Sequence, residues 1–108
     1  MSAADSQGYR DACSTMQVPA SGIYFTTLGS QEVMLSRDKA GDIVAVSGFC
    51  THSMGRLEGG KVEGDVIICP HHGARFNFRT GRAMTSCPNL AKFDVKIAGH
   101  RVLVRVGR

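Results

Sequence analysis

Hydrophobic and polar residues alternate with a period of two near both ends of the chain. Short runs of this kind, separated by turns that contain glycine, predict half-buried β-strands. Such runs occupy residues 9–18, 23–28, 32–37, 42–47, 92–97 and 101–106. The three runs between 23 and 47 predict consecutive antiparallel strands. The last two flank Ala98-Gly99-His100 and predict a β-hairpin with an exposed tip, because glycine adopts positive φ at little cost.

The stretch 48–85 interrupts this alternation, and it contains seven of the 13 glycines. Only two short strands are expected within it, at 66–69 and 74–78. The predicted fold is therefore all-β, with an antiparallel β sandwich or barrel base formed by residues 1–47 and 86–108. A loop-rich lobe at 48–85 is inserted into this base, and residues 1–108 make one domain.

Composition restricts the class of protein further. The chain has 108 residues and a mass of 11.6 kDa, which leaves no room for a separate catalytic domain. Its first residues lack the basic and apolar segments of a signal peptide, and no apolar run is long enough to cross a membrane. We therefore expect a cytoplasmic protein, and in a reducing compartment clustered cysteines bind metal more often than they form disulfides.

Five of the eight cysteine and histidine residues fall between positions 50 and 72. They form a Cys-x-His motif with Cys50 and His52, and a Cys-x-x-His motif with Cys69 and His72, separated by sixteen residues. Each half offers one thiolate and one imidazole, which together indicate a metal centre. A structural zinc site is an alternative, although zinc sites more often combine Cys-x-x-Cys with His-x-x-x-His.

The two motifs resemble those of the Rieske iron–sulfur family, and the second continues here as Cys69-Pro70-His71-His72-Gly73. The resemblance implies a [2Fe-2S] cluster in which Cys50 and Cys69 hold one iron and His52 and His72 hold the other. His71 is then a neighbour of the cluster and not a ligand. Neutral imidazoles in place of two thiolates make reduction easier than in an all-cysteine cluster.

Departures from the respiratory members of the family imply a lower reduction potential. Their additional cysteines correspond to Gly55 and His71, so no disulfide can join the two loops, and their serine and tyrosine correspond to Ala74 and Phe76. Without these two hydroxyl donors the reduced cluster is less stabilised, and we expect a midpoint below zero. The glycines beside the ligands either admit backbone N–H donors or serve turns with unusual φ.

The resemblance implies a one-electron carrier and not an enzyme, similar to the ferredoxin component of aromatic-ring-hydroxylating dioxygenases. Its partners would be a flavin-containing reductase and a terminal oxygenase. A small Rieske subunit of a stable complex, as in nitrite reductase, is the second possibility. Nucleic acid is not an expected partner, because no aromatic pattern accompanies the basic residues.

Charge is distributed unevenly along the chain. Residues 1–69 contain five basic and eight acidic side chains, whereas residues 70–108 contain eight basic and one acidic. We expect a partner to contact the loops at 51–55 and 71–75, with basic residues at the edge of the contact. These edge candidates are Arg56, Arg75, Arg79 and Arg82. Cys13 and Cys87 lie outside the motif and are expected to be buried residues or free thiols.

Overall fold

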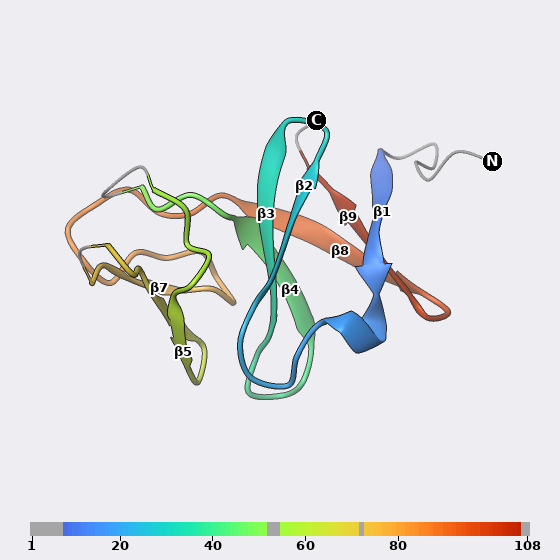
Figure 1. Cartoon of the computed structure of the whole chain (residues 1–108), viewed down its shortest axis with the longest axis horizontal. Coiled ribbons are helices and arrows are strands. Elements are labelled where there is room, and N and C mark those ends of the chain that lie inside the picture. Colours follow the sequence, from blue (N-terminus) through green and yellow to red (C-terminus); the bar gives the residue numbers. More distant parts are fainter. Residues whose placement is uncertain (1–7, 52–54, 72, 107–108) are drawn as a thin grey trace.

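A computed structural model describes residues 8–51, 55–71 and 73–106. The molecule is elongated, with extents of 41 × 26 × 19 Å, and has a larger sheet at one end and a smaller sheet at the other (Figure 1). None of its described helices has the length and apolar character needed to cross a membrane. The prediction of an all-β antiparallel fold is confirmed.

The described residues form nine strands and one short 3-10 helix. The elements are β1 (Tyr9–Ser14), η1 (Thr15–Gln17), β2 (Tyr24–Leu28), β3 (Gln31–Arg37), β4 (Ile43–Ser47), β5 (Lys61–Glu63), β6 (Val66–Ile68), β7 (Arg75–Asn77), β8 (Lys92–Ala98) and β9 (Arg101–Arg105). Six of them make the base sheet in the order β1-β9-β8-β4-β3-β2, and the lobe sheet has the order β5-β6-β7. All neighbouring strands are antiparallel.

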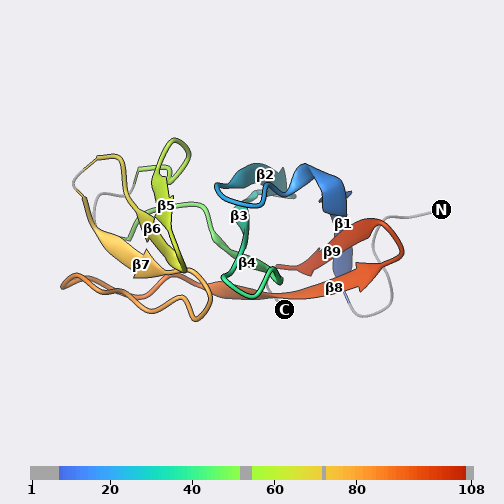
Figure 2. The same cartoon turned by 90° about the horizontal axis from the view of Figure 1, so that it is seen from below.

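The base sheet is curved, and its edge strands β1 and β2 come into contact (Figure 2). Val33 and Leu35 of β3 pack into a core enclosed by this sheet, together with Val102 and Val104 of β9. Met34 points to the opposite face and belongs to a second core, which it shares with the lobe. Burial of β3 on both faces therefore attaches the lobe to the base.

The second core contains buried aromatic and aliphatic residues of the lobe, including Leu57, Ile67, Phe76 and Phe78. Ile67 of β6 and Phe76 of β7 are directly paired across the lobe sheet, so this row faces the core. Strand β5 was not predicted, because Lys61-Val62-Glu63 contains a single apolar residue and follows two glycines, which are typical of a turn. Pairing with β6 holds β5 in its extended conformation.

The prediction of an opening strand over residues 9–18 was wrong in its extent. Strand β1 ends at Ser14, and the chain then forms η1. The Ser14 hydroxyl accepts a hydrogen bond from the Met16 N–H, while the Gln17 side chain accepts one from the Ser14 N–H. This capping box satisfies amide groups that would otherwise favour continued strand pairing.

Candidate metal centre

The two motif cysteines begin two loops of the same construction. The Cys50 N–H donates to the Gly55 carbonyl at 2.7 Å, and the Cys69 N–H donates to the Ala74 carbonyl at 2.8 Å. Each bond closes a six-residue loop between antiparallel neighbours. Phe49 and Arg56 form a bridge outside the first loop, and Ile68 and Arg75 are paired outside the second. The two cysteines therefore occupy matching positions, each at the start of a loop that is closed by the same kind of backbone hydrogen bond.

Both cysteines are buried in the core shared by base and lobe. Cys50 is 0% exposed and Cys69 is 2% exposed, and both belong to one cluster that also contains Leu57 and Ala74. Two buried sulfur atoms on backbone-fixed loops fit the thiolate half of a [2Fe-2S] site. The two predicted histidine ligands, His52 and His72, lie outside the described residues.

The two loops also meet directly, at Gly55 and His71. A Cβ atom on Gly55 would lie 2.5 Å from His71 Nε2 and 2.6 Å from its Cδ2. The His71 ring therefore packs against the glycine backbone, and the two positions where the respiratory proteins would carry their additional cysteines are in contact. Gly55 was expected to admit backbone donors or to serve a turn with unusual φ, whereas the structure shows that its small size admits the His71 side chain.

We expect Gly55→Ala to displace the His71 ring and loosen the contact between the loops, because the new methyl group occupies the position of the ring. His71→Ala removes the same contact. The measurement is the rate at which the visible absorption of the cluster is lost on heating, and both variants should lose it faster. The double variant should resemble the single variants, with a coupling energy of about 0.5–3 kcal/mol. Additive effects would show that the two residues act separately.

The first loop is also attached to the segment that leads back to the base. The Thr51 hydroxyl donates a hydrogen bond to the Pro88 carbonyl. Pro88 follows Cys87, whose side chain is half-buried against the core that holds the two motif cysteines. The segment around Pro88 is therefore tied to the first loop by a side-chain hydrogen bond.

The other two cysteines are not in disulfide bonds, as expected. Cys13 is buried in the base core, which is separate from the core of the motif cysteines. Burial raises the pKa of the Cys13 thiol, although the positive charge of Arg101 acts in the opposite direction. The thiol therefore stays protonated and is a poor metal ligand.

His100 is exposed at the tip of the β8–β9 hairpin, as predicted.

An all-β base that presents two buried cysteines on matching loops at one end is typical of a small metal-binding protein. Residues 9–103 match the Rieske [2Fe-2S] domain family, and the chain belongs to this family. It is 34% identical, over 87% of its length and 91% of the relative's, to the ferredoxin component of a naphthalene 1,2-dioxygenase system from Pseudomonas aeruginosa.

Two solved structures are similar over most of the chain. The ferredoxin of carbazole 1,9a-dioxygenase from Nocardioides aromaticivorans IC177 has 27% identity and a TM-score of 0.80, covering 90% of this chain and 96% of that one. A complex of reduced oxygenase and oxidized ferredoxin in carbazole 1,9a-dioxygenase contains a chain with 29% identity and a TM-score of 0.78, covering 87% and 98%. These similarities assign the protein an electron-transfer role and one [2Fe-2S] cluster.

Proposed function

We propose that this protein takes electrons from a flavin-containing reductase and passes them singly to the terminal oxygenase of an aromatic-ring dioxygenase system. The observation that carries the proposal is the pair of buried cysteines on equivalent loops at one end of the molecule. The similar ferredoxin components of naphthalene and carbazole dioxygenases support the choice of partners. We also propose a cytoplasmic location.

In this proposal Cys50 and Cys69 hold one iron of the cluster, and His52 and His72 hold the other. The bound cluster supplies reversible one-electron chemistry. The chain's own contribution is to fix the ligands. Each motif cysteine is held by a short backbone bond and by burial. Contacts at Gly55 and His71 limit movement of the loops when the charge of the site changes.

We propose a base of residues 1–47 and 86–108 and a cluster-binding lobe of residues 48–85. The base sheet and the lobe sheet support this division. The lobe shares its core with Met34 and Val46 of the base, which supports the proposal that the two parts form one domain.

The test combines metal analysis with electron transfer. The purified protein should contain about two irons and two sulfides per chain, and reduction by dithionite should give the EPR signal of mixed histidine and cysteine ligation. Purified terminal oxygenases of the naphthalene, biphenyl and carbazole systems are then offered to the reduced protein in stopped-flow experiments. At least one should be reduced. A colourless protein that contains one zinc would overturn the proposal.

The midpoint potential of the cluster should lie below zero, toward the lower end of the range of about −150 to +300 mV for such centres. Ala74 and Phe76 offer no hydroxyl group to the cluster, and both are buried, at 1% and 0% exposure. Redox titration followed by visible circular dichroism measures the potential. A midpoint above zero would show that other donors replace the missing hydroxyl groups.

A further inference from the structure

The equivalent construction of the two cysteine loops places an arginine at the same position beside each of them. Arg56 follows the first loop and is bridged to Phe49, and Arg75 follows the second and is paired with Ile68. Each loop therefore has one apolar and one cationic residue at its base. The two arginines have different neighbours. The side of the lobe next to the first loop therefore differs in charge from the side next to the second loop.

The charge of Arg56 is compensated within the protein. Its guanidinium lies 3.2 Å from the Glu32 carboxylate and 3.5 Å from that of Glu58, and it lies over the ring of Phe25 at 5.8 Å from the centroid. Two carboxylates beside one guanidinium leave little positive charge for a partner. Of the residues described on this side of the lobe, Phe49 is the large apolar side chain that is partly exposed.

Arg75 is in the opposite situation. Among the described residues it forms no ion pair, and the same is true of Lys61. Lys61 of β5, Ile68 of β6 and Arg75 of β7 are paired in one row across the lobe sheet. Because the adjacent row of Ile67 and Phe76 faces the core, this row faces outward, and the backbones of its two cationic residues are about 10 Å apart.

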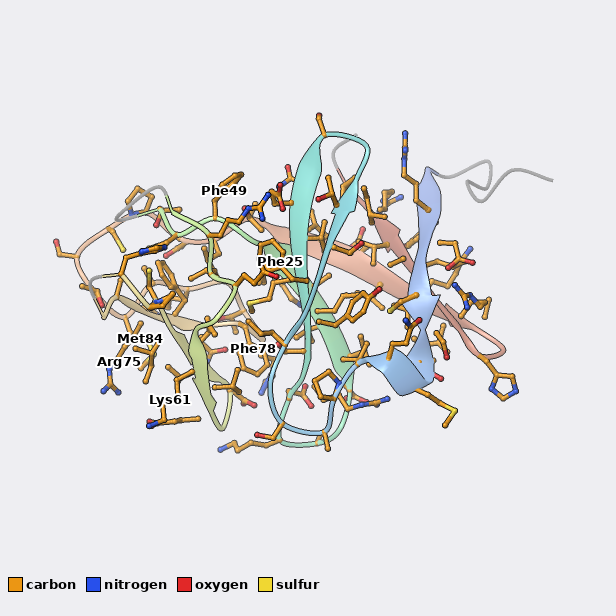
Figure 3. All side chains as sticks on the ribbon, viewed as in Figure 1. Phe25, Phe49, Lys61, Arg75, Phe78 and Met84 are labelled. Atoms are coloured by element: carbon orange, nitrogen blue, oxygen red, sulfur yellow. The ribbon has the colours of Figure 1, made fainter. Side chains whose placement is uncertain are left out.

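Met84 extends this row beyond the edge of β7. Its N–H donates to the Arg75 carbonyl at 2.8 Å, and its side chain is 58% exposed. Ala83, the preceding residue, is bridged to Phe76 and packs against the core, so the alternation places Met84 on the outer face. Figure 3 shows Met84, Arg75 and Lys61 following one another along the lobe.

The row lies at the end of the lobe sheet that carries the second cysteine loop. Cys69 follows Ile68 directly, and Arg75 directly follows the loop's last residue. The row at the other end of the sheet contains Glu63, Val66 and Asn77 and has no cation. Positive charge on this face is therefore concentrated next to the metal centre.

We propose that Lys61, Ile68, Arg75 and Met84 form a docking strip for the terminal oxygenase. The surface of the oxygenase that binds this strip would be acidic and would include an apolar patch. This inference rests on the proposed function, which makes an oxygenase the electron acceptor. The two uncompensated cations attract and orient the acidic surface, and the exposed methionine and half-buried isoleucine supply the apolar area between them. Docking here brings the acceptor to the second cysteine loop, whereas the compensated side around Arg56 remains outside the contact.

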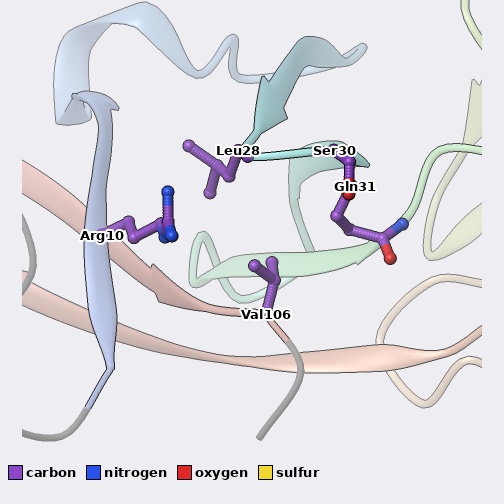
Figure 4. Close-up of a pocket in the computed structure, with 6 residues that line it drawn as sticks. Arg10, Leu28, Ser30, Gln31 and Val106 are labelled. Atoms are coloured by element: carbon purple, nitrogen blue, oxygen red, sulfur yellow. The ribbon is translucent and has the colours of Figure 1, made fainter.

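The test is a double charge reversal, Lys61→Glu with Arg75→Glu, and a matched control, Arg10→Glu with Lys39→Glu. Both variants change the net charge equally. Arg10 is an exposed residue of the base that lines a pocket of about 300 Å³ with Leu28, Ser30 and Val106, away from the lobe (Figure 4). Lys39 is exposed in the β3–β4 turn. Iron content and the reduced EPR spectrum should match the wild type in both variants.

Stopped-flow rates are measured with whichever oxygenase of the naphthalene, biphenyl and carbazole panel the wild type reduces fastest. At about 0.15 M ionic strength, where charges more than about 8 Å apart are screened, the strip variant should be at least about tenfold slower than wild type. The control should remain within about twofold, and the difference should shrink at high salt. Met84→Ala should lower the rate about threefold without changing its salt dependence.

Three results would overturn the inference. The strip variant could match the control, or the loss could affect only reduction of the carrier by the flavin reductase, which would assign the strip to the wrong partner. In these two cases the wild type still reduces the oxygenase, so the proposed function stands. If the wild type reduces no oxygenase in the panel, the proposed function and the docking strip both fail.

Discussion

Replacing Cys69 by alanine should abolish the visible absorption of the protein and lower its iron content by more than about tenfold. The Cys69 sulfur is buried in the core, and the loop behind it is fixed by bonds from the Cys69 N–H to Ala74 and from the Gly73 N–H to the Cys69 carbonyl. Iron analysis and absorption spectroscopy measure the result.

Cys13→Ala is the matched control for this experiment. Cys13 is as buried as Cys69, at 2% exposure, but it lies in the base core. Its replacement removes one sulfur atom from a packed interior and should cost about 1 kcal/mol of stability while leaving the iron content unchanged. Loss of iron in the Cys13 variant would show that the cluster depends on general core packing, and not on the predicted ligands.

Gly81→Ala should destabilise the protein by about 3 kcal/mol, of which about 1–2 kcal/mol comes from the left-handed backbone conformation. Gly81 has φ +83°, and a Cβ atom there would lie 2.5 Å from the backbone oxygen of Leu90. The Leu90 N–H also donates to the Gly81 carbonyl at 2.7 Å. The chain returns from the lobe to β8 past this contact. The added methyl group can therefore be accommodated only if the backbone at Leu90 moves. Urea unfolding followed by far-ultraviolet circular dichroism measures the change.

Gly99→Ala separates the conformational part of this cost from the steric part. Gly99 also has positive φ, at +61°, but a Cβ atom there would meet nothing within 4 Å. The variant should therefore lose only about 1 kcal/mol. If the two variants lost equal amounts of stability, the close approach of Leu90 to Gly81 would contribute nothing to the cost of Gly81→Ala.

Much of the base could be predicted because its strands carry their signal locally. The runs that became β2, β3 and β4 alternate clearly and are separated by glycine turns, and the hairpin of β8 and β9 has its turn at Gly99. The N-terminal segment was predicted less well. A side-chain hydrogen bond between Ser14 and Gln17 decides where β1 ends, and hydrophobic alternation contains no information about it.

The candidate site was also predicted in part from the sequence and in part seen only in the structure. Cys50, His52, Cys69 and His72 were predicted as ligands from the two motifs and from the family that these motifs resemble. The structure places Cys50 and Cys69 on closed loops in one core. The edge of the contact surface was predicted as four arginines, including Arg56. The structure separates Arg56 from Arg75 because Glu32, far away in the chain, lies beside only one of them.

The sequence by itself determined the class of fold, the two ligand motifs and the family, because alternation, turn residues and motif spacing act over a few neighbouring residues. Tertiary structure alone decided which distant groups meet. It packs His71 on Gly55, brings Leu90 against Gly81, and aligns Lys61, Ile68 and Arg75 in one row. Each of these contacts depends on strand register and on the path by which the lobe returns to the base, and both are set by packing of the two cores.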